Sequence, residues 1–266
     1  MPAQQWIDIG VNLTDSSFDA DYHDVIEQAV DSGVTKLIIT GTTLKESEQA
    51  IALCQQYPET LYCTVGAHPH YAKDHTEEDF RQIRSLLNEP NVVAIGETGL
   101  DFNRNASPPL LQVEAFERQI ETACEYQLPL FLHERDAHKK QIEILRHHRD
   151  HFSKAVAHCF TGNKDELYSY LDLDLYIGIT GWVCDERRGL ELQKLIKEIP
   201  ANRLMLETDS PYLLPRTIRP RPKSRRNHPH NLIYIATQLC ELTGKSLDQL
   251  SEETYGNSID FFSLSP

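Results

Sequence analysis

The sequence has no apolar run long enough to cross a membrane. Its longest apolar segments, such as KLIIT at 36–40 and PLFL at 129–132, are far shorter than the ~18 residues that a spanning helix needs. The first residues, MPAQQWIDIG, have neither the basic start nor the apolar stretch of a secretory signal. We therefore predict a cytoplasmic protein that does not enter a membrane.

The sequence also has no closely spaced cysteine pair. Its 6 cysteines contain no CxxC motif, which argues against a disulfide framework and against a zinc ribbon. They occupy positions 54, 63, 124, 159, 184 and 240. We expect all of them to be reduced thiols.

Positive charge is scarce as well. The chain has 26 Lys and Arg against 40 Asp and Glu, a formal charge of −14, which excludes a protein that coats nucleic acid non-specifically. One segment departs from this balance, because RTIRPRPKSRR at 216–226 contains six basic residues and no acidic one. A polyanionic partner would therefore have to be bound locally.

Short β-rich runs alternate with helical patterns along the whole chain. The runs fall at 6–11, 35–40, 61–67, 92–97, 128–133, 154–159, 174–180 and 203–208. The clearest helix is predicted at 114–126, where Phe116, Ile120, Ala123 and Cys124 share one face. Alternating strands and helices indicate parallel βαβ units. We predict a single α/β domain over 1–266, a (β/α)8 TIM barrel of the metal-dependent hydrolase type, with a doubly wound sheet as the open alternative.

Metal-binding side chains stand where four of the predicted strands end. They are Glu97, His133, His158 and Asp209, and His68 and His70 follow a further strand. In a parallel barrel the carboxyl ends of the strands converge. Two imidazoles and two carboxylates suit a divalent cation, although each residue alone could equally cap a helix or hydrogen-bond locally. Cys159 follows His158 directly, and strand alternation predicts that it packs in the core.

Eight segments, in order, resemble the TatD family of metal-dependent deoxyribonucleases, and the bacterial members most of all. They are DIGVNL (8–13), GAHPH (66–70), AIGETGLDF (94–102), LPLFLHERDA (128–137), HCFTG (158–162), GITGWVCDERRG (178–189), ETDSPYLLP (207–215) and RRNHP (225–229). The resemblance implies a TIM barrel that hydrolyses phosphodiesters with a divalent metal. It implies Glu97, His133, His158 and Asp209 as the metal ligands, and His68 beside the scissile phosphate.

The sequence departs from the family pattern at the end of the first strand. Most members have an Asp-x-His-x-His motif there, whereas this chain has Gly10 and Asn12 in place of both histidines. The loss of two imidazoles favours oxygen-preferring ions. We therefore expect Mg²⁺, with Mn²⁺ or Zn²⁺ as alternatives, and a weakened second metal position.

The expected chemistry is phosphodiester hydrolysis. Glu97 is expected to bind the metal, Asp209 to bind metal or to orient and deprotonate the attacking water, and His68 to steady the phosphate. We predict that arginine forks bind the phosphates. The predicted nucleic-acid contacts are Arg187, Arg188, Arg225, Arg226 and Asn227. The alternative for these basic segments is pairing with surface acids.

These expectations together favour a monomeric 3′–5′ exonuclease on single-stranded DNA, with RNA as a further substrate and a role in DNA repair; the polarity and the repair role follow from the resemblance. Two alternatives stay open. One is an amidohydrolase-like enzyme acting on a small cyclic amide or ester, and the other is a non-catalytic binding barrel.

Overall fold

The computed structural model describes residues 4–265, and its eight strands form one sheet in which each strand neighbours the next along the chain, from β1 to β8. All the strand pairings found are parallel. Helices occupy the connections between successive strands. This order confirms the predicted (β/α)8 fold class. Among these described residues, no helix is both long enough and apolar enough to span a bilayer.

The chain divides into two compact units by its internal contacts. Unit 1 contains residues 4–39, 159–167 and 177–265, and unit 2 contains 40–158 and 168–176. Four neighbouring strands belong to each: β7, β8, β1 and β2 to unit 1, apart from the first residue of β7, and β3 to β6 to unit 2. The prediction of a single domain over 1–266 stays a prediction.

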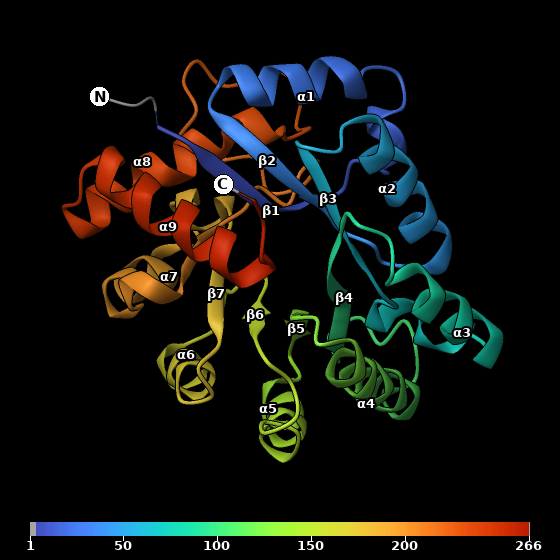
Figure 1. Cartoon of the computed structure of the whole chain (residues 1–266). Helices are drawn as coiled ribbons and strands as arrows, with labels where there is room; N and C mark the ends of the chain where they lie inside the picture. Colours follow the sequence, from blue (N-terminus) through green and yellow to red (C-terminus); the bar gives the residue numbers. More distant parts are fainter. Residues whose placement is uncertain (1–3, 266) are drawn as a thin grey trace. The chain divides into compact units, whose positions relative to one another are not determined.

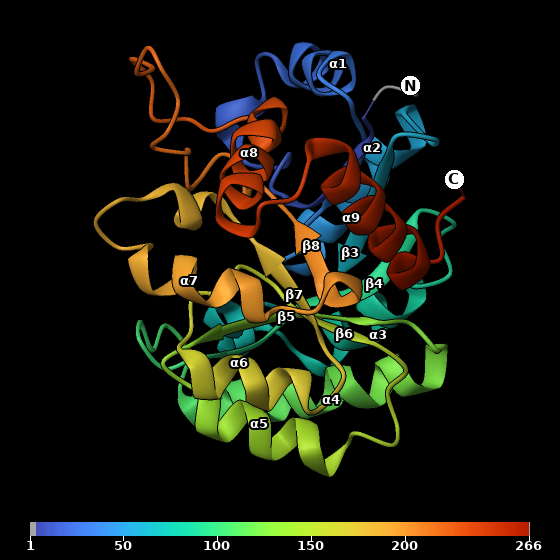
Figure 2. The same ribbon diagram turned by 90° about the vertical axis from the view of Figure 1, so that its left-hand side faces the viewer.

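Unit 1 joins the two ends of the chain. β1 pairs with β2 on one side, and on the other Val11 is bridged in parallel to Ser210, just after β8. Figure 1 shows α8 and α9 beside each other, and Figure 2 shows α9 against β8. Its strands and α-helices are β1 (Trp6–Val11), α1 (Tyr22–Asp31), β2 (Val34–Ile39), β7 (Tyr176–Ile179), α7 (Leu190–Leu195), β8 (Leu204–Leu206), α8 (Leu232–Thr243) and α9 (Leu247–Phe262). Its short 3-10 helices are η1 (Ser16–Phe18), η3 (Gly181–Cys184), η4 (Ile196–Glu198), η5 (Ala201–Arg203) and η6 (Pro229–Asn231).

Unit 2 carries the strands whose ends hold most of the predicted site. Its elements are α2 (Leu44–Gln56), β3 (Leu61–Val65), η2 (Pro69–Asp74), α3 (Glu77–Leu86), β4 (Val92–Asp101), α4 (Pro109–Tyr126), β5 (Leu130–Arg135), α5 (His138–His147) and β6 (Ala155–Ala157). Helix α6 (Lys164–Leu171) has residues in both units. On α4, Phe116, Ile120 and Ala123 are fully buried as predicted, whereas Cys124 is only half-buried.

One strand is longer than predicted, and this matters for the site. We predicted that β4 ends at Glu97, but it continues to Asp101. The pairing with β5 slips on the way, because Ile95 pairs with Leu130 while Thr98 pairs with Leu132. Three steps along β4 therefore match two along β5, which is the signature of a β-bulge.

Candidate metal centre

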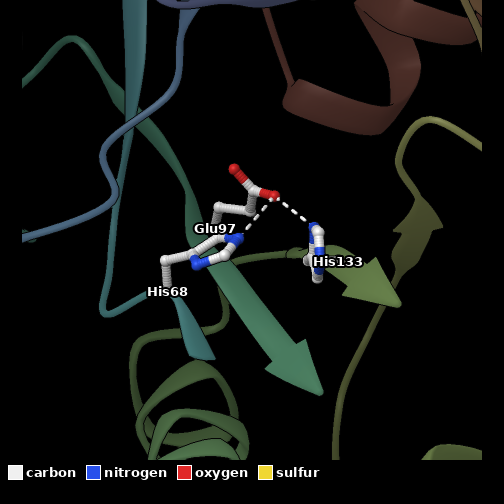
Figure 3. Close-up of side chains that lie close together, drawn as sticks. All are labelled: His68, Glu97 and His133. Carbon is white, nitrogen blue, oxygen red and sulfur yellow. Dashed lines mark hydrogen bonds and ion pairs between the residues drawn. The ribbon is translucent and has the colours of Figure 1, made fainter. Parts of the chain in front are cut away.

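Glu97 is the centre of a buried cluster of carboxylate and imidazole groups in unit 2. Its Oε1 lies 2.8 Å from His133 Nδ1 and 3.4 Å from His68 Nε2. Figure 3 shows the carboxylate between the two rings, with Glu97 on β4 and His133 on β5. The three side chains together form a group whose ligand atoms all lie within 4.8 Å of one another.

The backbone around Glu97 is fixed by close approaches that only glycine permits. Gly96 and Gly99 have φ of +146° and +133°, and a Cβ on Gly99 would lie 2.0 Å from the His133 carbonyl oxygen. The bulge and these two glycines therefore bring β4 tightly against β5. The Glu97 N–H donates to the Gly41 carbonyl at 2.8 Å, which fixes the backbone from which the carboxylate extends.

His68 is held as a neutral hydrogen-bond donor. It follows β3 and caps η2, where its Nδ1 accepts the His70 N–H at 3.1 Å. A ring nitrogen that accepts carries no proton, so the proton lies on Nε2, which faces Glu97. Burial lowers the pKa of His68 to about 4, in spite of the neighbouring Glu97. His68 is therefore uncharged at neutral pH.

His133 lies between two carboxylates. Its Nδ1 faces Glu97, and its Nε2 lies 3.3 Å from Asp101 Oδ2. Burial opposes the charged ring, but the hydrogen bonds to Asp101 and Glu97 outweigh it and raise the pKa of His133 to about 9. Burial likewise disfavours the Glu97 carboxylate, yet the hydrogen bonds from His133 and His68 hold its pKa well below the usual value.

Asp101 is a site residue that sequence reasoning missed. It is buried, and its Oδ2 lies 2.7 Å from His70 Nε2 as well as 3.3 Å from His133 Nε2. Its Oδ1 accepts the N–H groups of Asn103 and Arg104. A carboxylate behind a ligand histidine fixes the orientation and basicity of the imidazole. The segment AIGETGLDF contains Asp101, but the strand predicted from the sequence ends at Glu97, four residues before it.

His158 completes the set of imidazoles around Glu97. It follows β6, and its N–H donates to the Leu132 carbonyl at 2.9 Å. The ring lies against Phe131, and Nε2 is 3.9 Å from Glu97 Oε1. Three of the four predicted metal ligands are thus brought together in unit 2.

Asp209 belongs to unit 1, directly after β8. Its N–H donates to the Gly10 carbonyl, and its Oδ1 accepts from Asn12 Nδ2 at 3.0 Å. Asn12 occupies one of the positions where most family members have histidine, so here that position orients Asp209. Cys159 also differs from its prediction. It is half-exposed, with φ of +48°, and its sulfur lies within 4.8 Å of an Asp209 carboxylate oxygen. The prediction of core packing is wrong because β6 ends at Ala157 and strand alternation no longer applies.

The donor atoms in unit 2 fit a divalent cation. Ligand bonds of about 2.0–2.2 Å place neighbouring donors roughly 3.0–3.5 Å apart at angles of 90–110°. The distances from Glu97 Oε1 to His133 Nδ1 and His158 Nε2 are 2.8 and 3.9 Å. The set mixes one carboxylate with imidazoles, which is a common donor set for Zn²⁺ and Mn²⁺ and also admits Mg²⁺.

The predicted phosphate contacts after β7 are engaged in ion pairs. Arg187 and Arg188 both bond the carboxylate of Asp185, which is nearly buried. The Arg188 guanidinium also lies 4.3 Å from the Trp182 ring. The hydrogen bonds of Arg187 and Arg188 hold the pKa of Asp185 far below its usual value. Both arginines keep more than half of their side-chain surface exposed, so their outer faces are open to solvent.

The loop 207–228 has no helix, as its prolines predicted, and its charges fall into two groups. Arg226 pairs with Asp21 and lies 5.2 Å from the Phe18 ring, and Arg216 pairs with Glu186. Within residues 4–265, in contrast, no ion pair is found for the four exposed cations of this loop, of which Arg219 donates to backbone carbonyls. The other three are Arg221, Lys223 and Arg225. The alternative of pairing with surface acids therefore holds for part of the loop.

Asn227 has a structural role in this geometry. It is fully buried, its Nδ2 donates to the Thr208 carbonyl, and its Oδ1 accepts from the His228 N–H and from Asn231. The Asn227 amide is thus already bonded to groups of the protein itself. This geometry favours a role for Asn227 in holding the segment before Asp209 in place, rather than direct contact with nucleic acid.

A family model described as TatD related DNase matches residues 7–263. Curated relatives share 49% identity over nearly their whole length. A protein of Erwinia tasmaniensis named 3′-5′ ssDNA/RNA exonuclease TatD aligns over 257 residues, 97% of this chain and 99% of its own. A protein of the same name from Edwardsiella piscicida aligns over 258 residues, with the same coverage of both chains.

Solved structures share the fold. The TatD family hydrolase of Entamoeba histolytica superposes with a TM-score of 0.90 at 29% identity, covering 99% of both chains. The TatD homologue YjjV of Escherichia coli gives 0.89 at 26% identity, covering 98% of this chain and 99% of the other. An uncharacterised TIM-barrel protein of Bordetella bronchiseptica, at 11% identity and a TM-score of 0.59, covering 93% of this chain and 84% of its own, supports the fold alone.

Proposed function

The chain belongs to the TatD family of deoxyribonucleases, and from this premise we propose that it is a metal-dependent 3′–5′ exonuclease on single-stranded DNA and RNA. The observation that carries the proposal is the Glu97 carboxylate, which has three imidazole nitrogens within 3.9 Å. The substrate and polarity are those named for relatives at 49% identity.

Glu97, His133 and His158 would hold the metal, and we propose Asp209 as the fourth ligand. Mg²⁺ is the proposed ion, with Mn²⁺ and Zn²⁺ as alternatives. A divalent ion in such a site lowers the pKa of bound water and neutralises charge on a phosphoryl oxygen. The missing histidines at Gly10 and Asn12 leave this unit 2 set as the stronger metal position.

The protein's own groups have distinct roles in the proposed reaction. His68 presents Nε2–H toward the centre, which suits donation to a phosphate oxygen or to the leaving oxygen. Asp101 fixes the ring of His133 through Nε2. The Asn12 amide donates to Asp209 Oδ1 and fixes its orientation, and we propose that this carboxylate binds the metal or the attacking water.

The substrate path is proposed along the unpaired cations of the loop 207–228. Arg225, a predicted nucleic-acid contact, belongs to this set, since it is exposed and has no ion pair among the described residues. The outer faces of Arg187 and Arg188 add to it, whereas Arg226 would have to leave Asp21 to bind a phosphate. If three phosphates are bound, the affinity for single strands falls with log salt at a slope of about −2.

The cellular location, oligomeric state and biological role are also proposed. The six cysteines are all free thiols, which accords with the reducing cytoplasm. We propose that the protein acts there as a monomer and that it trims DNA ends during repair.

The test uses a 5′-labelled single-stranded oligonucleotide with Mg²⁺, with EDTA, and with the variant Glu97→Ala. The wild-type protein should produce a ladder of labelled products, each shorter by one nucleotide, and both EDTA and Glu97→Ala should abolish it. Glu143→Ala is the matched control, because Glu143 is an exposed glutamate on α5 that pairs with Lys140.

Each contrary result has a definite meaning. Immediate release of the label as a mononucleotide would reverse the polarity. A ladder that survives both EDTA and Glu97→Ala would reject the metal centre. Intact DNA with turnover of a small cyclic amide would favour the amidohydrolase alternative. Binding without turnover of either would favour a non-catalytic barrel.

A further inference from the structure

One exposed aromatic side chain touches the metal centre. Tyr71 has 41% of its surface exposed, and its ring centroid lies 6.2 Å from that of His68 in an edge-on arrangement. Two other tyrosines, Tyr168 and Tyr212, have comparable exposure. Tyr168 belongs to α6, and the hydroxyl of Tyr212 donates to Asp15.

The backbone holds Tyr71 firmly while leaving the ring open. Its N–H donates to the His68 carbonyl at 2.9 Å, and its own carbonyl lies 2.9 Å from His75 Nδ1. The next residue, Ala72, is buried and fixes η2 to the protein. A large ring on a rigid segment loses little conformational freedom when a ligand covers it, so its exposed area is well suited to binding.

Cations accompany this ring in unit 2. Lys73 lies two residues further along η2, and Arg104 lies in the loop after β4, where its N–H bonds Asp101. Both side chains are exposed, and within residues 4–265 neither makes an ion pair. The loop that carries Arg104 contacts the segment that carries Lys73, because the Lys73 N–H donates to Ser107 Oγ in that loop. An aromatic ring with open cations nearby is the combination by which proteins bind single-stranded nucleic acid.

We propose that Tyr71 is a stacking platform for a nucleobase of the substrate, the base of one of the two nucleotides that flank the scissile phosphate. Lys73 and Arg104 attract the adjoining backbone. The inference rests on the proposed nuclease function and adds a base-binding subsite to it. Because every base presents a π-face, the platform accepts all four bases and contributes affinity without sequence preference.

The alternative of a purely structural tyrosine makes a different prediction. A structural Tyr71 would pack its ring against protein, and its removal would lower stability. With 41% of its surface exposed, Tyr71→Ala should leave the unfolding temperature within about 2 °C of the wild type, since surface substitutions usually change stability by under about 0.5 kcal/mol.

The direct test is a fluorescence measurement in EDTA, where no hydrolysis occurs. The probes are oligothymidylates carrying 2-aminopurine at the last or the second-to-last position. Binding of the wild-type protein should quench the 2-aminopurine at one of these positions, because stacking on an aromatic ring quenches it. Tyr71→Phe should retain the quenching and Tyr71→Ala should lose it. Tyr168→Ala, with 42% exposure, is the matched control and should behave as wild type.

A thermodynamic cycle with Mg²⁺ supplies the second measurement. Stacking of one base contributes about 1–3 kcal/mol, so Tyr71→Ala should lower kcat/KM on an intact oligonucleotide by about five- to 150-fold, mainly through KM. On an oligonucleotide with abasic sites at the last two positions, the variant and the wild type should differ by less than two-fold. Tyr71→Phe should restore the activity on the intact strand.

The two proposals fail in different ways. If the wild-type protein leaves the oligonucleotide intact with Mg²⁺, the nuclease proposal fails, while the quenching in EDTA still decides the stacking platform. If the strand is shortened but 2-aminopurine is not quenched at either position, the stacking inference alone is overturned. Equal loss of kcat/KM on intact and abasic strands in Tyr71→Ala would also overturn it.

Discussion

Asn227 allows a sharp test of whether a residue near the site supports the protein or contacts the substrate. The variant Asn227→Ala removes an amide that satisfies three groups, the Thr208 carbonyl, the His228 N–H and the Asn231 side chain. The site is fully buried, so water does not readily replace the amide. Each group left without a partner costs about 1 kcal/mol or more.

The summed effect is roughly 3 kcal/mol of unfolding free energy. For a chain of this size, 1 kcal/mol shifts the unfolding temperature by about 2–4 °C, so Asn227→Ala should melt about 6–12 °C below the wild type. Differential scanning calorimetry and urea denaturation measure the change. Asn88→Ala is the control, because Asn88 is exposed and its one side-chain bond, to the Ser85 carbonyl, is long at 3.5 Å; it should shift the temperature by under about 2 °C.

Binding distinguishes the two roles. In EDTA, the folded variant should bind a single-stranded oligonucleotide within two-fold of the wild type and with the same salt slope. An unchanged melting temperature, together with binding weakened by more than about five-fold, would refute the structural role. It would restore Asn227 as a nucleic-acid contact.

Three further outcomes are expected. Asp101→Asn should weaken Mn²⁺ binding, measured by calorimetry, by about ten- to 100-fold, because a neutral amide replaces the charged carboxylate that bonds His133; affinity within two-fold of wild type would contradict this. Gly99→Ala should destabilise by more than about 2 kcal/mol in urea, because its Cβ would lie 2.0 Å from a carbonyl oxygen; an unchanged denaturation midpoint would contradict it. Arg226 holds the pKa of Asp21 below its usual value of 3.8. The coupling free energy between the two side chains, up to about 1 kcal/mol, should therefore be complete above pH 3.8 and be lost as the pH falls through the lowered pKa of Asp21. A double-mutant cycle in which the coupling free energy does not change with pH would disprove it.

The sequence predicted that side chains at the ends of neighbouring strands lie together. His133 and His158 lie next to Glu97, and His68 joins them, because the carboxyl ends of neighbouring parallel strands lie together whatever their separation in sequence. The (β/α)8 fold followed from the same alternation of strands and helices. Both inferences use only local patterns and one general rule of topology.

What escaped prediction depends on contacts between distant residues. Asn12 and Asp209 are 197 residues apart, and Arg226 and Asp21 are 205 apart, so no local pattern announces either pair. Asp101 was missed for a different reason. Its strand contains Gly96 and Gly99, and glycine is uncommon within strands, whereas here the two glycines allow the strand to continue against β5.

The bulge in β4 has a consequence for how this protein can change in evolution. Glu97 and Asp101 are four residues apart on one strand and both face His133. Side chains alternate between the two faces of a strand. Gaining or losing one residue between Ile95 and Thr98 would therefore move every side chain that follows in β4 to the opposite face of the sheet. Surface loops generally tolerate changes in length, whereas this short stretch cannot change in length without moving those side chains. Descendants that keep the activity should therefore keep the spacing from Ile95 to Asp101 fixed, even where the residues themselves diverge.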